Sequence, residues 1–395
     1  MIQERLKALR AEMEKRGITV YVVPTADFHE SEYVGDHFKA RKFITGFTGS
    51  AGTAVITLDE AGLWTDGRYF VQAENQLKDS TVTLYRMGEE GVPTVDEFVK
   101  DRLKEGGCLG FDGRVVNGTW GGRLEKIAAE KNVSMHVTED LIDLIWEDRP
   151  ALSKQPLFIL EEKYSGKSTA DKIGDLRKAM KENGADVHIL TSLYDIAWLL
   201  NIRGNDIDYV PVVLSYLVLN ETECIWFLQE EVVDDKIRAY LEENHITTKP
   251  YDAIYDYVPE IPADAVVLMN RGTVNYRIVN SLDKAIKVVD KPNPTELMKA
   301  VKNKTEVDNT RAAHVKDGVA FTKFMYWLKT NIGKIPMTEI SASDYLEARR
   351  REQDNFIELS FDTICAYGPN AAMMHYAATP ESDAELKPEG FLLVD

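Results

Sequence analysis

His375 is the first of three residues whose type and setting could do chemistry. It follows the turn signal Gly368-Pro369-Asn370, and we expect residues 373–376 to resume an extended segment. Loops often carry functional residues, and an imidazole just beyond a turn could hydrogen-bond a developing oxyanion. A lone histidine is more often structural than catalytic, so this residue alone leaves both interpretations open.

Arg68 is the second candidate and directly follows the turn signal Asp66-Gly67, between an apolar segment and an expected helix. Its guanidinium can pair locally with Asp66, or it can reach a carboxylate across an interface. The sequence favours neither the local ion pair nor the more distant contact.

Asp395 is the third candidate and closes residues 390–395, Gly-Phe-Leu-Leu-Val-Asp, which we expect to form a buried strand. Burying a carboxylate alone is costly, and hard divalent ions such as Mn²⁺ take carboxylate and imidazole ligands. From this residue alone we favour a strand that simply ends in solvent. A strand that ended the chain here would leave an unpaired edge and an apolar face that other residues must cover. We therefore expect the chain to be truncated within its third unit.

The elements that precede these residues repeat one plan. Each copy has an amphipathic helix, a glycine at the helix C-terminus and a short apolar strand. The copies comprise residues 6–13, Gly17 and 20–23, and then residues 170–182, Gly184 and 187–190. Both continue into a predicted hairpin, with first strands at 53–57 and 211–214 and return strands that carry Trp64 and Trp226. This order predicts two related α/β domains in tandem.

Two proline-bounded connectors, at 149–156 and 291–294, divide the chain. After the second, we expect Thr295 to cap a helix that lacks the reciprocal acid of a capping box and continues as a helical stretch to about residue 329. A further helix is expected after Ser343. The resulting domains are residues 1–152, 153–292 and 293–395.

Composition limits the partners and the compartment. The formal net charge of −18 disfavours nucleic acid, which is itself a polyanion. No run approaches the ~18–20 apolar residues of a membrane span, and the N-terminus has no apolar signal-peptide core. Three scattered cysteines, Cys108, Cys224 and Cys365, fit a reducing compartment. We expect a cytoplasmic protein that binds neither nucleic acid nor membrane.

Taken in order, several motifs resemble those of the three-domain aminopeptidase P family of metallopeptidases. The motifs are Ser31-Glu32-Tyr33, Gly46-Phe47-Thr48-Gly49, Trp64-Thr65-Asp66-Gly67-Arg68, Asn201-Ile202-Arg203-Gly204 and Gly368-Pro369-Asn370 with His375-Tyr376. The resemblance covers essentially the whole chain. It implies an α/β and α+β architecture, with two tandem creatinase-type N-terminal domains followed by the beginning of a pita-bread catalytic domain.

The same resemblance implies roles for the three candidates. His375 matches a histidine that contacts substrate near the scissile bond, Arg68 an arginine that binds the peptide, and Asp395 the first ligand of a two-metal site. The family's remaining ligands, an Asp, a His and two Glu, follow Asp395 and are not in this chain.

The implied activity is release of the N-terminal residue from Xaa-Pro peptides by a hydroxide that two divalent ions activate, with Mn²⁺ the expected metal. The implied partners are proline-containing peptides and a second copy in a homodimer. We expect the 395 residues alone to bind metal weakly or not at all and to be inactive.

Two alternatives remain at this point. One is a non-catalytic pita-bread module that binds peptides or proteins, since an acidic surface suits basic partners. The other is a prolidase or creatinase relative.

Overall fold

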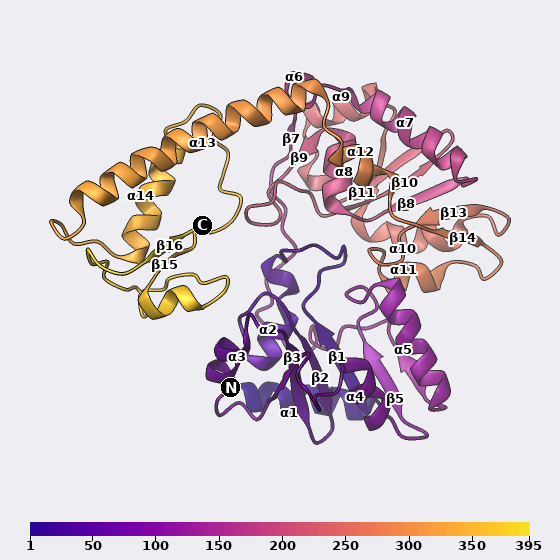
Figure 1. Cartoon of the computed structure of the whole chain (residues 1–395). Coiled ribbons are helices and arrows are strands. Elements are labelled where there is room, and N and C mark those ends of the chain that lie inside the picture. The colour runs from indigo at the N-terminus through magenta and orange to yellow at the C-terminus, as the bar shows by residue number, and fades with distance from the viewer. The chain divides into compact units, whose positions relative to one another are not determined.

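The computed structural model describes all 395 residues and contains two compact units, Met1–Val301 and Lys302–Asp395 (Figure 1). None of its helices has both the length and the apolar character needed to cross a membrane.

The first unit contains two six-stranded mixed sheets. The strands of the first sheet are β1 (Val20–Pro24), β2 (Thr53–Thr57), β3 (Ala61–Thr65), β4 (Thr83–Arg86), β5 (Cys108–Phe111) and β6 (Ser134–His136). Those of the second are β8 (Val187–Leu190), β10 (Ser215–Asn220), β11 (Cys224–Leu228), β12 (Thr247–Pro250), β13 (Val266–Met269) and β14 (Lys287–Asp290). A separate pair joins β7 (Phe158–Ile159) to β9 (Ile202–Arg203).

The two sheets share one topology. Their strand orders are β4-β3-β2-β1-β5-β6 and β12-β11-β10-β8-β13-β14. Position by position, the strand directions also agree, with an antiparallel hairpin in the middle and parallel strands at both ends. Trp64 and Trp226 are both buried on the return strands β3 and β11. The predicted duplication is therefore confirmed.

Helices flank each sheet. In the first domain they are α1 (Ile2–Lys15), η1 (Asp36–Phe38), α2 (Ala40–Thr45), α3 (Phe70–Gln76), α4 (Val95–Arg102) and α5 (Gly118–Glu130). In the second they are α6 (Glu162–Ser165), α7 (Thr169–Glu182), α8 (Leu193–Leu200), η2 (Glu230–Val232), α9 (Asp235–Glu243), η3 (Tyr251–Ala253), α10 (Ile254–Tyr257), η4 (Val258–Glu260), α11 (Tyr276–Ser281) and α12 (Pro294–Ala300).

The helices α1 and α7 are the two predicted amphipathic helices, and Gly17 and Gly184 after them have φ of 67° and 63°. Positive φ costs glycine little, which explains why each helix stops there.

The predicted strand at 211–214 is wrong, since β10 begins only at Ser215. Pro211 has no backbone N–H to donate to a neighbouring strand. The Leu214 N–H instead donates to the Asp206 carboxylate at 2.9 Å. Leu214 is therefore held by a side chain instead of a neighbouring strand.

The two domains of the first unit pack through α5 and α11, which lie next to each other in Figure 1. The Gly118 N–H donates to the Val274 carbonyl at 2.8 Å, and the Tyr276 N–H donates to the Val116 carbonyl at 2.7 Å. A Cβ added at Gly121 would lie 2.1 Å from a ring atom of Tyr276, so glycine permits this close approach.

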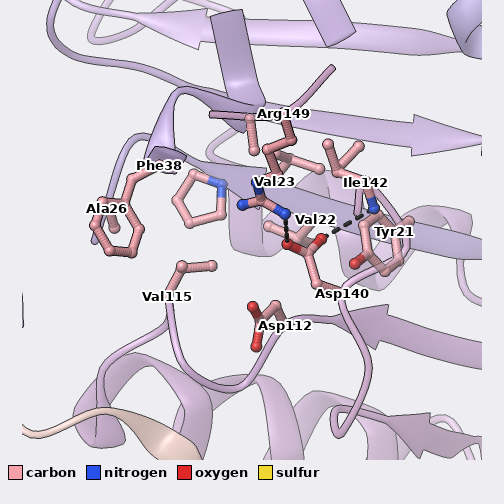
Figure 2. Close-up of a pocket in the computed structure, with 12 residues that line it drawn as sticks. Tyr21, Val22, Val23, Ala26, Phe38, Asp112, Val115, Asp140, Ile142 and Arg149 are labelled. Carbon is pink, nitrogen blue, oxygen red and sulfur yellow. Dashed lines mark hydrogen bonds and ion pairs between the residues drawn. The ribbon is translucent and has the colours of Figure 1, made fainter. Parts of the chain in front are cut away.

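A buried ion pair anchors the start of the connector between the domains. Figure 2 shows the Asp140 carboxylate between Arg149, whose Nη1 lies 2.6 Å from it, and the Ile142 N–H, at 2.9 Å. Burial and the nearby Asp112 carboxylate raise the pKa of Asp140. The cavity beside these groups has a volume of about 10 Å³, enough for one water molecule and too small for a peptide.

The second unit contains α13 (Lys304–Asn331), α14 (Glu339–Arg351), β15 (Cys365–Tyr367), η5 (Gly368–Ala372) and β16 (Leu392–Val394). The strands β15 and β16 pair antiparallel. Its core joins both helices to this strand pair through Phe324, Met337, Ala342, Leu346, Cys365 and Leu386.

The helix boundaries after the second connector correct four predictions. Helix α12 begins at Pro294 with Asn293 as its N-cap, so Thr295 lies inside the helix and does not cap it. Glu296 supplies the acid predicted to be missing, because its carboxylate accepts the Asn293 N–H at 3.1 Å. The helical stretch is also interrupted, since Asn303 and Glu306 form a capping box that starts α13. Helix α14 starts at Glu339, well before Ser343.

The strand at the end of the chain is not buried as predicted. Phe391 is 92% exposed and Leu393 44% exposed. Only β15 pairs with β16, so one edge and much of the surface of this strand face solvent.

Candidate functional site

Arg68 lies in the turn between β3 and α3 and forms the local pair with Asp66, one of the two contacts that the sequence left open. Its Nε and Nη2 donate to the two carboxylate oxygens of Asp66 at 2.8 and 2.9 Å. This bidentate contact lowers the pKa of the Asp66 carboxyl. Both side chains remain partly exposed, so a ligand carboxylate can approach the same guanidinium.

Arg41, which the sequence analysis missed, organises the glycine-rich loop beside this turn. Its guanidinium donates to the carbonyls of Phe47 and Gly49 and, through Nε, to the Thr25 hydroxyl at 2.9 Å. Burial without a carboxylate partner lowers the pKa of Arg41 to about 10. The Tyr69 hydroxyl lies 2.6 Å from the Ser50 hydroxyl and connects this loop to the Arg68 turn.

His375 lies on a turn instead of the predicted extended segment. Its φ is +52°, in the left-handed region, and its side chain is exposed. Histidine enters this region more readily than most residues, although the conformation still costs of order 1 kcal/mol or more. The imidazole is therefore presented to solvent from a strained backbone position.

Glu339 holds the segments on both sides of His375, and the sequence analysis did not find it. Its carboxylate is fully buried and accepts the Tyr367 N–H at 2.6 Å, the Tyr376 hydroxyl at 2.7 Å and the Ala384 N–H at 3.1 Å. The Asn370 side-chain amide donates to both carboxylate oxygens at 3.0 and 3.2 Å. In the sequence, Glu339 precedes the helix expected after Ser343 and resembles any acid near a helix start, so nothing signalled its burial.

Asp395 lies at the end of β16, where its backbone exchanges hydrogen bonds of 2.9 and 3.0 Å with Ile364. Its carboxylate is exposed. Within residues 1–395, no group of three or more His, Cys, Asp or Glu side chains could hold a metal ion. Asp395 is therefore not part of such a group.

Family profiles match nearly the whole chain. Two profiles of the creatinase/prolidase N-terminal domain match residues 5–145 and 148–306, and the profile of metallopeptidase family M24 matches residues 308–395. Fold and profiles together define a chain with two creatinase-type N-terminal domains and a metallopeptidase M24 domain.

Comparison with individual relatives identifies the family within this class of proteins. The chain is 38% identical to probable Xaa-Pro aminopeptidases P from Neurospora crassa and Sordaria macrospora, over 99% of its own length and 59% and 66% of theirs. It is also similar to the crystal structure of X-prolyl aminopeptidase from Caenorhabditis elegans, with 31% identity and a TM-score of 0.92 over 98% of this chain and 66% of that one. The chain belongs to the Xaa-Pro aminopeptidase P family, and it spans about three fifths to two thirds of the length of these relatives.

Proposed function

We propose that this protein, at the length of its curated relatives, releases the N-terminal residue from peptides whose second residue is proline. The observation that carries the proposal is the similarity to the Caenorhabditis elegans X-prolyl aminopeptidase over 98% of the chain. The names of the fungal relatives and the M24 match support it.

His375 is the proposed catalytic residue. The Xaa-Pro bond is a tertiary amide, so its nitrogen has no hydrogen for the enzyme to recognise, and the ring constrains its geometry. Hydrolysis passes through a tetrahedral species with a developing negative oxygen, and the His375 ring would donate a hydrogen bond to that oxygen. The exposed, left-handed position of His375 supports this assignment, because strained residues cluster at functional sites.

Arg68 is the proposed peptide-binding residue. Its guanidinium already binds a carboxylate, that of Asp66, in bidentate geometry, and the same donors suit the carboxylate of a short peptide. Binding would exchange an exposed ion pair for another of similar strength, which costs little.

We further propose two divalent ions, with Mn²⁺ as the metal and Asp395 as one ligand. The Caenorhabditis elegans structure, described as that of a cytosolic enzyme with a di-nuclear active site, supports two ions and a cytosolic location. Carboxylate oxygen is a preferred ligand of Mn²⁺. Homodimerisation is proposed from the family resemblance alone.

The test is a peptidase assay on the protein at the length of its relatives. Xaa-Pro-Xaa, Xaa-Pro and Xaa-Ala-Xaa peptides are incubated with Mn²⁺ or with chelator, and the products are identified by mass spectrometry. We expect Mn²⁺-dependent release of the first residue from Xaa-Pro-Xaa, with little cleavage of Xaa-Ala-Xaa. Cleavage of the dipeptide alone would identify a prolidase, and no cleavage of any peptide would reject the proposal.

A further inference from the structure

We propose that Tyr69 is a positioning residue for Arg68, because its ring keeps the guanidinium in place when a peptide carboxylate replaces Asp66. This inference deepens the proposed function and rests on it for the effect on peptide binding. The contact between the two side chains can be tested without any activity.

The guanidinium of Arg68 has two contacts of different kinds. Its Cζ lies 5.2 Å from the centroid of the Tyr69 ring, within the ~6 Å over which an aromatic ring attracts a cation. Its Nε and Nη2 donate to the Asp66 carboxylate at 2.8 and 2.9 Å. The ring attracts the cation as a whole, whereas the carboxylate binds two of its N–H groups. A second carboxylate can therefore take the place of Asp66 without displacing the ring.

The ring of Tyr69 is held firmly in the domain. Tyr69 is 2% exposed, and its hydroxyl lies 2.6 Å from the Ser50 hydroxyl. The Phe47 ring meets it edge-on, with the ring centroids 5.9 Å apart. A Cβ added at Gly49 would lie 2.8 Å from a ring atom of Tyr69, so the loop backbone lies directly against the ring. These contacts fix the position of the ring.

Buried Arg41 fixes the loop that holds this ring. Its guanidinium donates to the carbonyls of Phe47 and Gly49, and its Cζ lies 4.6 Å from the centroid of the Phe47 ring. The Thr25 hydroxyl accepts a hydrogen bond from Arg41 Nε and donates one to the Gly52 carbonyl, both at 2.9 Å. Both ends of the loop are thus tied to the body of the domain, and the support is continuous from the interior to the exposed turn.

Arg68 needs this support once Asp66 is replaced. Asp66 lies two residues before Arg68, and its Oδ1 also accepts the Arg68 backbone N–H at 3.1 Å. A ligand carboxylate is not part of the turn, so the exchange removes this local restraint on a long side chain. Ordering a flexible side chain weakens binding, whereas a side chain that is already oriented binds more tightly. The buried ring of Tyr69 remains in place in both states.

The competing interpretation is that Tyr69 only packs the glycine-rich loop against the start of α3. Packing alone accounts for the contacts with Ser50 and Phe47. It predicts that loss of the ring lowers stability and that the effect on peptide binding is the same whichever residue occupies position 68. Positioning predicts instead that the effect on binding disappears when Arg68 is replaced.

The structural arm of the test measures the NMR order parameter of the Arg68 Nε–H bond in the 395-residue chain. Asp66→Asn removes the charge of the local partner and keeps an oxygen for the turn. We expect the order parameter to stay near the wild-type value in Asp66→Asn and to fall below about 0.6, the range of flexible groups, when Tyr69→Leu is added. The matched control adds Tyr85→Leu, which removes a ring stacked on Trp64 in the same domain and should cause no such fall.

Two results of this arm would overturn the proposal. One is a fall below about 0.6 in Asp66→Asn alone, which would show that the ring does not hold the guanidinium. The other is an unchanged order parameter in a folded Asp66→Asn/Tyr69→Leu variant. If Tyr69→Leu does not fold, Asp66→Asn and NOEs between the Arg68 side chain and the Tyr69 ring in the wild type decide, and a missing NOE also overturns the proposal.

The binding arm uses a double-mutant cycle in the longer protein, with KM for an Xaa-Pro-Xaa peptide as the readout. A cation–π contact at an exposed site corresponds to a change of about two- to fivefold, so we expect Tyr69→Leu to raise KM by this factor at constant kcat. Tyr69→Phe keeps the ring and should recover most of the affinity. In Arg68→Gln, addition of Tyr69→Leu should raise KM no further, and this cycle isolates the contact from any other that Arg68 makes.

An equal rise in KM from Tyr69→Leu with and without Arg68 would overturn the positioning role, as would no recovery in a folded Tyr69→Phe. Failure of the proposed function gives a different result. If the wild-type protein cleaves no Xaa-Pro peptide, or if Arg68→Gln leaves KM unchanged, peptide binding by Arg68 is rejected. The order parameters then still decide whether Tyr69 holds the guanidinium.

Discussion

At the scale of single residues, Arg68 combines a local role with the proposed binding role. Its bidentate pair with Asp66 is half exposed on both sides, and exposed pairs contribute ~0–1 kcal/mol to stability. In the proposed binding role, a peptide carboxylate would take the place of Asp66, and the geometry of the guanidinium as well as its charge would decide the affinity.

We expect Arg68→Lys to raise KM about tenfold and to leave kcat unchanged, since an ammonium keeps the charge and loses the two-pronged contact. Arg86→Lys is the control, because Arg86 also pairs with an exposed acid of this domain, Glu74. Steady-state kinetics on Xaa-Pro-Xaa measure both variants. Equal KM values for the two variants would exclude Arg68 from peptide binding.

The site residues predicted from the sequence lie in local motifs. Those found only in the structure contact residues that are distant in the sequence or contact backbone groups. Arg68, His375 and Asp395 lie in local motifs, and the Asp66 partner of Arg68 is two residues away. Glu339 acts through residues at least 28 positions distant, and Arg41 through carbonyl groups, which every residue has. A single sequence contains no signal for either arrangement.

At the scale of elements, apolar periodicity predicted α1, α7 and the strands that follow them, because these segments bury one face or both. The predicted element boundaries are wrong where one polar contact outweighs the apolar pattern of the sequence. Asn303 and Glu306 divide a continuous helical pattern, and Asp206 delays the start of β10. The fold class was therefore predictable, whereas the exact ends of the elements depended on side-chain hydrogen bonds.

Helix α5 offers a test of how the two N-terminal domains pack. A Cβ at Gly121 would lie 2.1 to 2.8 Å from three atoms of Tyr276, whereas a Cβ at the adjacent Gly122 would meet only Arg271, at 3.8 Å. We expect Gly121→Ala to lower the free energy of unfolding by about 1–3 kcal/mol through overpacking. Gly122→Ala should be neutral or stabilise by up to about 1 kcal/mol, since alanine favours helix. Urea unfolding of the two variants measures this difference, and equal stabilities would show that α5 is not held against Tyr276.

At the scale of the whole molecule, buried polar groups connect the duplicated domains. His29 of the first domain lies 3.0 Å from the Thr191 carbonyl through Nδ1 and 2.6 Å from the Tyr251 hydroxyl through Nε2, both in the second domain. Burial lowers the pKa of His29 to about 4. The ring is therefore neutral in the folded protein at neutral pH.

This histidine should make folding sensitive to acid. Between its folded pKa of about 4 and an unfolded value of about 6.5, only the unfolded chain takes up the proton, so stability falls as the pH falls through this window. The contribution lost between pH 7 and pH 5 is about 2 kcal/mol.

Urea unfolding at several pH values tests this linkage. The wild type should lose more stability between pH 7 and pH 5 than His29→Gln, whereas the control His245→Gln, which alters an exposed histidine, should follow the wild type. A His29→Gln variant with the same pH dependence as the wild type would show that His29 is not the group responsible.

His375, on an exposed turn, is the residue that we propose acts on the Xaa-Pro bond. This role is tested by kcat for release of the first residue from an Xaa-Pro-Xaa peptide, measured for wild type and His375→Gln at the length of the relatives with Mn²⁺ supplied. We expect a decrease of about 10²–10³ in kcat with the fold and KM nearly unchanged. A decrease smaller than about threefold in a folded variant would rule out this role, because a group that stabilises the developing oxyanion contributes far more than that.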